Sequence, residues 1–155
     1  MSLHFSNQEF SNRKKNIIKS MKDNNLDALL MFRQESMYWL TGYDTFGYVF
    51  FQTLILDQQG NLILLTRAPD LRQAQNTSNI KDIRIWIDQD KASPTEDLKQ
   101  ILNELNLKGK KVGVEYEAYG MTGRNAMRLN KSLENYCKVE DHSELITKHR
   151  VIKSQ

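Results

Sequence analysis

The stretch YVFFQTLILDQQGNLILLT, residues 48–66, carries the clearest structural signal in the chain. Aromatic and β-branched residues dominate Tyr48 to Leu56 and predict a long strand, and LILLT at 62–66 predicts a second strand. Between them, DQQGN at 57–61 has the composition of a turn, so the two strands should form a hairpin. Because a hairpin pairs antiparallel strands, the sheet that contains it is not purely parallel.

On either side of this hairpin, predicted strands alternate with predicted helices. Short apolar or β-rich runs predict further strands at 26–31, 83–87, 111–115 and 136–140. Capping residues and apolar stripes at helical spacing predict helices after Ser6, over 36–40, over 70–76, after Ser93, over 123–133 and over 142–149. This alternation, with one early hairpin, predicts a single α/β domain with a mixed β-sheet, and 155 residues suffice for one core.

The composition argues against several classes of protein. No apolar run approaches the ~18 residues that cross a bilayer, and no signal-peptide pattern is visible, so we expect no membrane partner and a cytoplasmic location. The single cysteine, Cys137, fits a reducing cytosol. It lies in a predicted strand without a neighbouring histidine or basic cluster, which favours a buried thiol over a catalytic one. A net charge of +3 is too small to imply a polyanionic partner.

Motifs of known catalytic and metal-binding sites are absent from the sequence. It contains no GxSxG elbow, Walker loop, GxGxxG fingerprint or HExxH pair. His142 and His149 are two helical turns apart, which is about 10 Å at ~1.5 Å per residue and too far to share a metal ion. Glu115 and Glu117 could form an acid pair, but we expect ordinary solvated carboxylates. We therefore predict no catalytic residue, metal ligand or cofactor in this chain.

Half of the chain's aromatic side chains lie in YWLTGYDTFGYVFF, residues 38–51. Counting Tyr as Phe, residues 44–51 match six of the eight positions of the RNA-binding strand signature K/R-G-F/Y-G/A-F-V-x-F/Y. Asp44, however, stands where a basic residue would meet phosphate. No Lys or Arg occurs between Arg33 and Arg67, and the matching strand comes second rather than third in the predicted order. We therefore expect no nucleic-acid partner.

The order of these segments resembles the N-terminal domain of the creatinase/prolidase (Xaa-Pro peptidase) family. A basic helix, RKKNIIKSMKDNN, leads into LDALLMF, then Ser36 and Met37, and then the hallmark Y-x-L-T-G-Y at 38–43. The hairpin with its D-x-x-G turn, the LTRA segment, the KVGVE strand and the closing R-x-I-K-S at 150–154 follow in the family's order. The resemblance covers essentially the whole chain, and WLTGYD with its following aromatics is most similar to creatinase- and ectoine-hydrolase-like members.

The resemblance implies a ribonuclease-H-like domain over residues 1–155, with three layers and helices on both faces of a mixed sheet. It also implies that the catalytic residues belong to a C-terminal pita-bread domain absent from this chain, together with two divalent metal ions (Mn, Co or Zn) in the peptidases. The implied partners are that catalytic domain, a second copy in a homodimer, and a small peptide or an amide or amidine substrate.

The resemblance implies that the loop after the hallmark motif is the part that faces substrate. The residues we expect to line substrate access are Trp39, Tyr43, Asp44, Phe46 and Tyr48, with Arg67 as a clamp for a carboxylate. The residues we expect to pack in the core instead are Tyr38, Leu40, Val49 and Phe51. For Trp39, Tyr43 and Phe46, core packing is an equally good interpretation. A second class of function also stays open, a stand-alone module that holds a small molecule on the aromatic loop.

Overall fold

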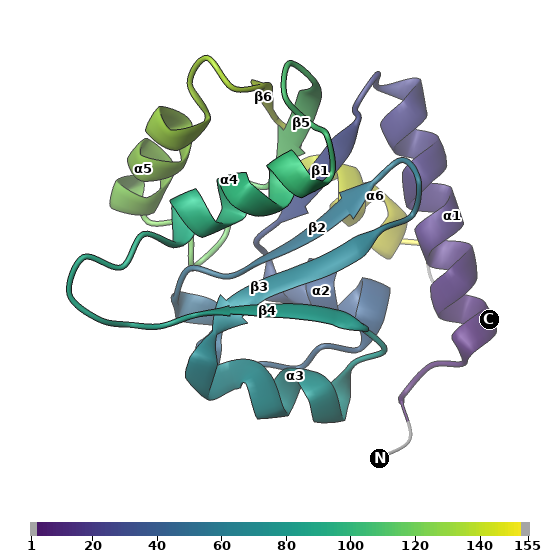
Figure 1. The fold of residues 1–155 in the computed structure, drawn as a ribbon. Coiled ribbons are helices and arrows are strands. Elements are labelled where there is room, and N and C mark those ends of the chain that lie inside the picture. Colours follow the sequence, from purple (N-terminus) through teal and green to yellow (C-terminus); the bar gives the residue numbers. More distant parts are fainter. Residues whose placement is uncertain (1–2, 153–155) are drawn as a thin grey trace.

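The strands assemble into a mixed sheet, as the sequence predicts (Figure 1). The structure is a computed structural model that describes residues 3–152, and within that range the sheet has six strands in the order β4-β3-β2-β1-β5-β6. The strands are β1 (Ala28–Met31), β2 (Thr53–Asp57), β3 (Leu62–Arg67), β4 (Asp82–Trp86), β5 (Lys111–Val114) and β6 (Lys138–Asp141). β2 runs antiparallel to both β1 and β3, whereas the β1–β5, β3–β4 and β5–β6 pairs are parallel.

Helices cover both faces of this sheet and complete the expected three layers (Figure 1). One face is covered by α4 (Pro94–Glu104) and α5 (Gly123–Leu133). The other face is covered by α1 (Asn7–Asp23), α2 (Gln34–Thr41), α3 (Leu71–Thr77) and α6 (Glu144–Arg150). None of the helices within residues 3–152 is both long and apolar enough to span a bilayer.

The inner strands contain long apolar runs because each is buried on both sides. Successive side chains of a strand point to opposite faces of the sheet. In β1, Leu30 therefore packs under α4 and α5, while its neighbour Leu29 packs under α1, α2 and α6. In β2, Ile55 and Leu54 divide between the two cores in the same way. This double burial explains the uninterrupted apolar run ALLM of β1.

The first strand of the predicted hairpin is shorter than expected. It begins at Thr53 rather than Tyr48, and Gly47–Val49 forms a 3₁₀ turn, η1. The N–H of Phe50 donates back to the Gly47 carbonyl at 2.9 Å, so it is used within the turn rather than in a strand ladder. The prediction of core packing is confirmed for Leu40 and Phe51, whereas Tyr38 is half-buried. It is wrong for Val49, which the turn leaves about half exposed.

One of the two predicted capping boxes does not form. Ser6 caps α1 as expected, with its hydroxyl accepting from the N–H of Glu9 at 3.1 Å. Ser93 precedes α4 but makes no capping hydrogen bond through its side chain. The carboxylate of Glu96 accepts instead from the hydroxyl of Ser132 on α5. A tertiary contact between the two helices thus replaces the local cap. Of the closing R-x-I-K-S motif, residues 153 and 154 lie outside the described residues.

Candidate functional site

The aromatic loop that follows α2, residues 44–50, is held in place by contacts of its backbone. The N–H of Asp44 donates to the Thr77 hydroxyl at 3.1 Å, and that of Gly47 donates to the Thr45 hydroxyl at 2.9 Å. Gly47 also lies against Asp70, because a Cβ at this position would come within 2.5 Å of the Asp70 carboxylate. These contacts anchor residues 44–50 to α3 and to the segment before it, so the loop has a defined shape.

The predicted access residues of this loop differ sharply in exposure. Phe46 projects into solvent with 87% of its surface exposed, and Asp44 beside it is exposed too. Tyr48 is half-buried and packs edge to face against Tyr119, with 5.8 Å between ring centroids. Phe46 and Tyr48 thus present aromatic surface from an anchored loop.

Tyr43 lies inside the domain. Its side chain is fully buried, and its hydroxyl donates to Gln52 Oε1 at 3.0 Å and lies 3.3 Å from Thr66 Oγ1. Burial raises the pKa of this phenol above its usual value. A role for Tyr43 at the access path would therefore act through the loop that it supports and not through direct contact.

Trp39 lies on α2, where it contacts α1 and α6. The guanidinium of Arg13 lies 4.9 Å from a ring centroid of Trp39, and one of its N–H groups donates to the Trp39 carbonyl at 2.6 Å. The ring of His149 on α6 is 6.4 Å away. Trp39 is half-buried in this helix contact, separate from the anchors of the aromatic loop.

Arg67, the predicted carboxylate clamp, is engaged by groups of its own chain. Its guanidinium lies 3.3 Å from the carboxylate of Asp70 and 3.7 Å from that of Asp88. It also lies over the ring of Phe50, 3.4 Å from the centroid. A substrate carboxylate would have to compete with both aspartates for this cation.

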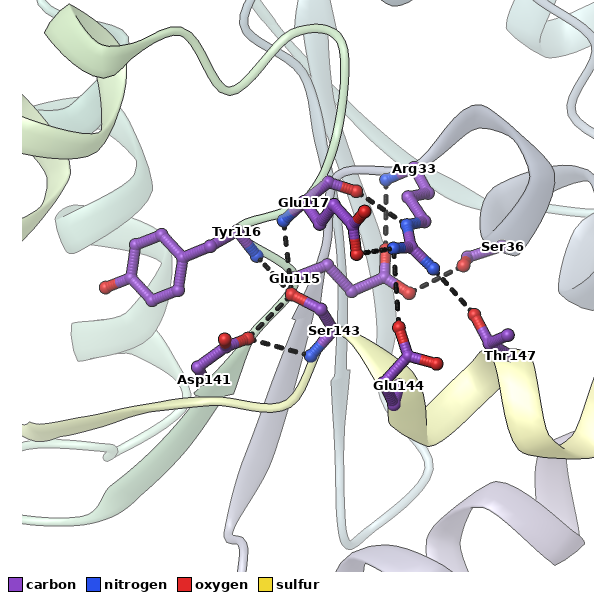
Figure 2. A network of polar contacts seen from close by, with 9 residues as sticks. All are labelled: Arg33, Ser36, Glu115, Tyr116, Glu117, Asp141, Ser143, Glu144 and Thr147. Carbon is purple, nitrogen blue, oxygen red and sulfur yellow. Dashed lines mark hydrogen bonds and ion pairs between the residues drawn. The ribbon is translucent and has the colours of Figure 1, made fainter.

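A network of polar contacts that the sequence did not suggest lies at the carboxyl ends of β1 and β5 (Figure 2). At its centre is the fully buried carboxylate of Glu115, directly after β5. One of its oxygens accepts from the backbone N–H groups of Phe32 and Arg33 at 3.0 and 2.9 Å, and the other accepts from the Ser36 hydroxyl at 2.6 Å. Glu115 thereby fixes the connection from β1 to α2.

Burial raises the pKa of Glu115 to about 7, because the charged form loses its hydration inside the protein. The hydrogen bonds from Ser36 and from the backbone N–H groups oppose this rise but do not cancel it. The expectation of two solvated carboxylates is thus confirmed for the exposed Glu117 and wrong for Glu115. Local sequence could not reveal this burial, since the donors come from a segment about eighty residues earlier.

Arg33 joins three segments at the same edge (Figure 2). Its Nε donates to the Glu117 carbonyl at 2.6 Å, and its Nη2 donates to the Glu117 carboxylate at 2.7 Å. Its Nη1 donates to the Thr147 hydroxyl on α6 at 2.6 Å, and Glu144 at the start of α6 lies 3.6 Å away. The guanidinium therefore links the ends of β1 and β5 to α6.

Ser143 completes the network on the side of β6 (Figure 2). Its hydroxyl accepts from the backbone N–H groups of Tyr116 and Glu117 at 2.9 and 3.1 Å and donates to Asp141 at 2.6 Å. The hydrogen bonds of this serine lower the pKa of Asp141 below its usual range. Ser143 therefore fixes the segment after β5.

A cleft of about 480 Å³ opens beside this network. One wall is formed by residues 116–119 after β5, and the other by residues 33–35 at the start of α2 and by Tyr48. Clefts at the carboxyl ends of neighbouring parallel strands are a common place for ligands in α/β sheets. Of the predicted access residues, Tyr48 lines this cleft, whereas Phe46 projects into solvent nearby on the same loop.

The remaining reactive side chains have structural surroundings. Burial raises the pKa of the Cys137 thiol to about 11, so it is an unreactive thiol at neutral pH. His149 Nε2 lies 2.8 Å from the Ser20 hydroxyl, and burial lowers its pKa. Within residues 3–152, no group of three or more His, Cys, Asp or Glu side chains is arranged to hold a metal ion. The polar network thus positions backbone segments, and the cleft lies beside it.

Sequence comparisons show which proteins this chain is similar to. The family model described as "Creatinase/Prolidase N-terminal domain" matches residues 13–152. The chain is 31% identical over 160 residues to the uncharacterized hydrolase/peptidase y4tM of Sinorhizobium fredii, which covers 99% of this chain and 41% of that protein. It is 25% identical over 168 residues to the ectoine hydrolase of Halomonas elongata, with 99% of this chain and 40% of that protein covered.

A solved structure is similar in fold. The dipeptidase from Pyrococcus horikoshii OT3 superimposes with a TM-score of 0.74 at 21% sequence identity, over 92% of this chain and 37% of that one. The chain thus spans about two fifths of the length of the curated relatives that it matches.

Proposed function

The chain belongs to the creatinase/prolidase N-terminal domain family, and from this premise we propose that it is a non-catalytic domain of a larger hydrolase, in which it walls the access path to a C-terminal active site. One observation carries the proposal. The match extends over nearly the whole chain, yet the chain spans only 41% and 40% of its two curated relatives. The remaining length of such an enzyme would contain the catalytic domain.

The proposed parent enzyme hydrolyses a bond in a small substrate, and that bond is an Xaa-Pro peptide bond, another amide or an amidine. The names of the two relatives support this class, since one is a hydrolase/peptidase and the other an ectoine hydrolase. Two divalent metal ions, Mn, Co or Zn, would act there as Lewis acids on the scissile bond. Their ligands would come from the C-terminal domain.

The aromatic loop is the part of this chain that we assign to the access path. Phe46 supports the assignment, because an exposed aromatic ring on a loop anchored by hydrogen bonds is a preformed contact surface. Tyr48 supports the assignment because it lines the cleft, and the exposed Asp44 adds a negative charge on the same loop. The partners in this account are the catalytic domain, a second copy in a homodimer and the substrate. We further propose a cytoplasmic location, which the single cysteine favours.

The cleft of about 480 Å³ favours a second candidate function, a stand-alone module that binds a small molecule between Tyr48 and residues 116–119. A volume of this size accommodates a ligand of small-metabolite dimensions. The coding sequence downstream of residue 155 separates the two functions. A continuous reading frame of about 200 further codons with the Asp, Asp, His, Glu, Glu ligand pattern of the family's catalytic domain would support the hydrolase, and a stop codon there would favour the module.

Kinetics of the parent enzyme test the assignment of the loop. Phe46→Ala should change KM or substrate selectivity several-fold while leaving the unfolding midpoint unchanged, since the ring contributes little to the core. Met127→Ala is the matched control, because Met127 is also exposed but lies on α5. If Phe46→Ala and Met127→Ala give the same kinetic constants for every substrate tested, Phe46 has no part in substrate access.

A further inference from the structure

The free edge of strand β4 has an unusual surface. β4 is the first strand in the sheet order, so among the described residues it pairs only with β3. Ile85, in β4, and Ile87, the first residue after it, are 45% and 58% exposed, and a spacing of two residues places both on one face where the chain continues in the strand direction. Exposed apolar side chains on an edge strand normally invite pairing with another strand, and many proteins avoid them for that reason.

The sequence of this edge is complementary to itself. Residues 84–88 read Arg-Ile-Trp-Ile-Asp, with opposite charges at the two ends and an isoleucine on each side of a central tryptophan. When two such segments pair antiparallel with Trp86 opposite the partner's Trp86, each Ile85 faces the partner's Ile87. In the same register, each Arg84 faces the partner's Asp88. The pattern therefore matches itself at every position.

We propose that β4 is a dimerisation strand, through which two copies of the chain pair edge to edge about a twofold axis at Trp86. The two sheets then form one continuous sheet, and four isoleucine side chains cluster on one face across the axis. Such a contact is isologous and closed, which explains why a second copy fits better than an unrelated strand.

The charged ends set the register more than they add affinity. Arg84 already bonds the carboxylates of Asp82 and Glu104, but about two fifths of its side chain is exposed and accessible to a third carboxylate. Asp88 is exposed, and its carboxylate lies 3.7 Å from the guanidinium of Arg67. A shift of two residues that brings Ile85 opposite the partner's Ile85 would lose this charge pair, since each Arg84 would then face the partner's Trp86 instead of Asp88.

The contact is small, so the dimer should be weak. A segment of five residues buries much less than the ~800 Å² per partner of a standard stable interface. The homodimer is part of the proposed function, but this contact rests on β4 alone. It would stand even if the chain had no catalytic domain.

Sedimentation velocity of the 155-residue chain over a concentration series tests the proposal. We expect a monomer–dimer equilibrium that Ile87→Lys or Ile85→Lys shifts to monomer at every concentration, with at least a tenfold loss of affinity. Met127→Lys, an equally drastic change at an exposed residue of α5, should dimerise like the wild type. A wild-type chain that stays monomeric at millimolar concentration, or an Ile87→Lys variant that dimerises normally, would overturn the proposal.

Disulfide trapping tests the register. In a Cys137→Ser background, Ile85→Cys and Ile87→Cys should each cross-link poorly with themselves but cross-link readily when the two proteins are mixed. In the proposed register the two positions are directly opposite, within the Cα separation that a disulfide spans, whereas each is about 8 Å from its own copy. Preferential self-cross-linking of either variant would refute this register.

Discussion

Glu115 shows how a single carboxylate can fix a junction between elements and at the same time make the fold sensitive to pH. It is fully buried, it accepts three hydrogen bonds from the β1–α2 connection, and its pKa rises to about 7. Between about pH 4.5 and pH 7 the unfolded chain has lost this proton while the folded chain retains it. The stability that Glu115 contributes is therefore present at low pH and is lost as the pH rises through about 7.

Comparing the pH dependence of unfolding for the wild type and Glu115→Gln measures this effect. Relative to the variant, the wild-type free energy of unfolding should fall by about 3 kcal/mol between pH 4.5 and pH 8, because folding raises the pKa of Glu115 from 4.5 to about 7. Urea denaturation at a series of pH values gives the difference directly. Glu134→Gln, a change at an exposed carboxylate after α5, is the control and should keep the wild-type slope. An unchanged slope in Glu115→Gln would show that this carboxylate titrates normally.

The residues of the aromatic loop show what sequence can and cannot separate. Tyr43, the last residue of the hallmark motif, and Phe46, three residues later, look alike in the sequence, since both are aromatic. The structure buries Tyr43 completely and exposes Phe46 almost completely. Only the buried partners Gln52 and Thr66, which come from two later segments, decide this difference.

Among the elements, the hairpin was predicted where it occurs, but its first strand was predicted five residues too long at its start. Composition predicts a strand wherever aromatic and β-branched residues gather. Residues 47–50 instead turn back on themselves and meet the segment after β5. This contact is long-range, so the local sequence could not reveal it. The other strands and helices were predicted from their apolar runs and capping residues, because their buried side chains recur at strand or helix spacing.

Gly120 lies at the contact between residues 47–50 and the segment after β5. A Cβ at Gly120 would lie 2.5 Å from the Phe50 carbonyl and 3.0 Å from the Tyr48 carbonyl, and backbone atoms cannot rotate away. Gly120→Ala should therefore lower the free energy of unfolding by about 1–3 kcal/mol and displace the loop. Gly123→Ala, at a glycine with open space around it, should be neutral or slightly stabilising. Equal midpoints in urea for the two variants would contradict the close approach.

For the whole molecule, topology brings together residues that lie far apart in the sequence. β1 pairs with β5, so Arg33 and Glu115, about eighty residues apart, meet at one edge of the sheet with Ser143 beside them. The sequence predicted a mixed sheet but not the order of its strands, and the polar network depends on that order. The cleft beside the network was therefore not predictable, whereas the family and its fold were.

In the proposed function, this chain is a domain without catalytic activity of its own. The most direct test is a turnover assay of the purified chain with Xaa-Pro dipeptides in the presence of Mn²⁺, Co²⁺ or Zn²⁺. We predict no hydrolysis above the rate without protein, because the chain matches the family's N-terminal domain and spans only about two fifths of its curated relatives. Hydrolysis that follows the chain through every purification step and disappears on its denaturation would contradict the claim.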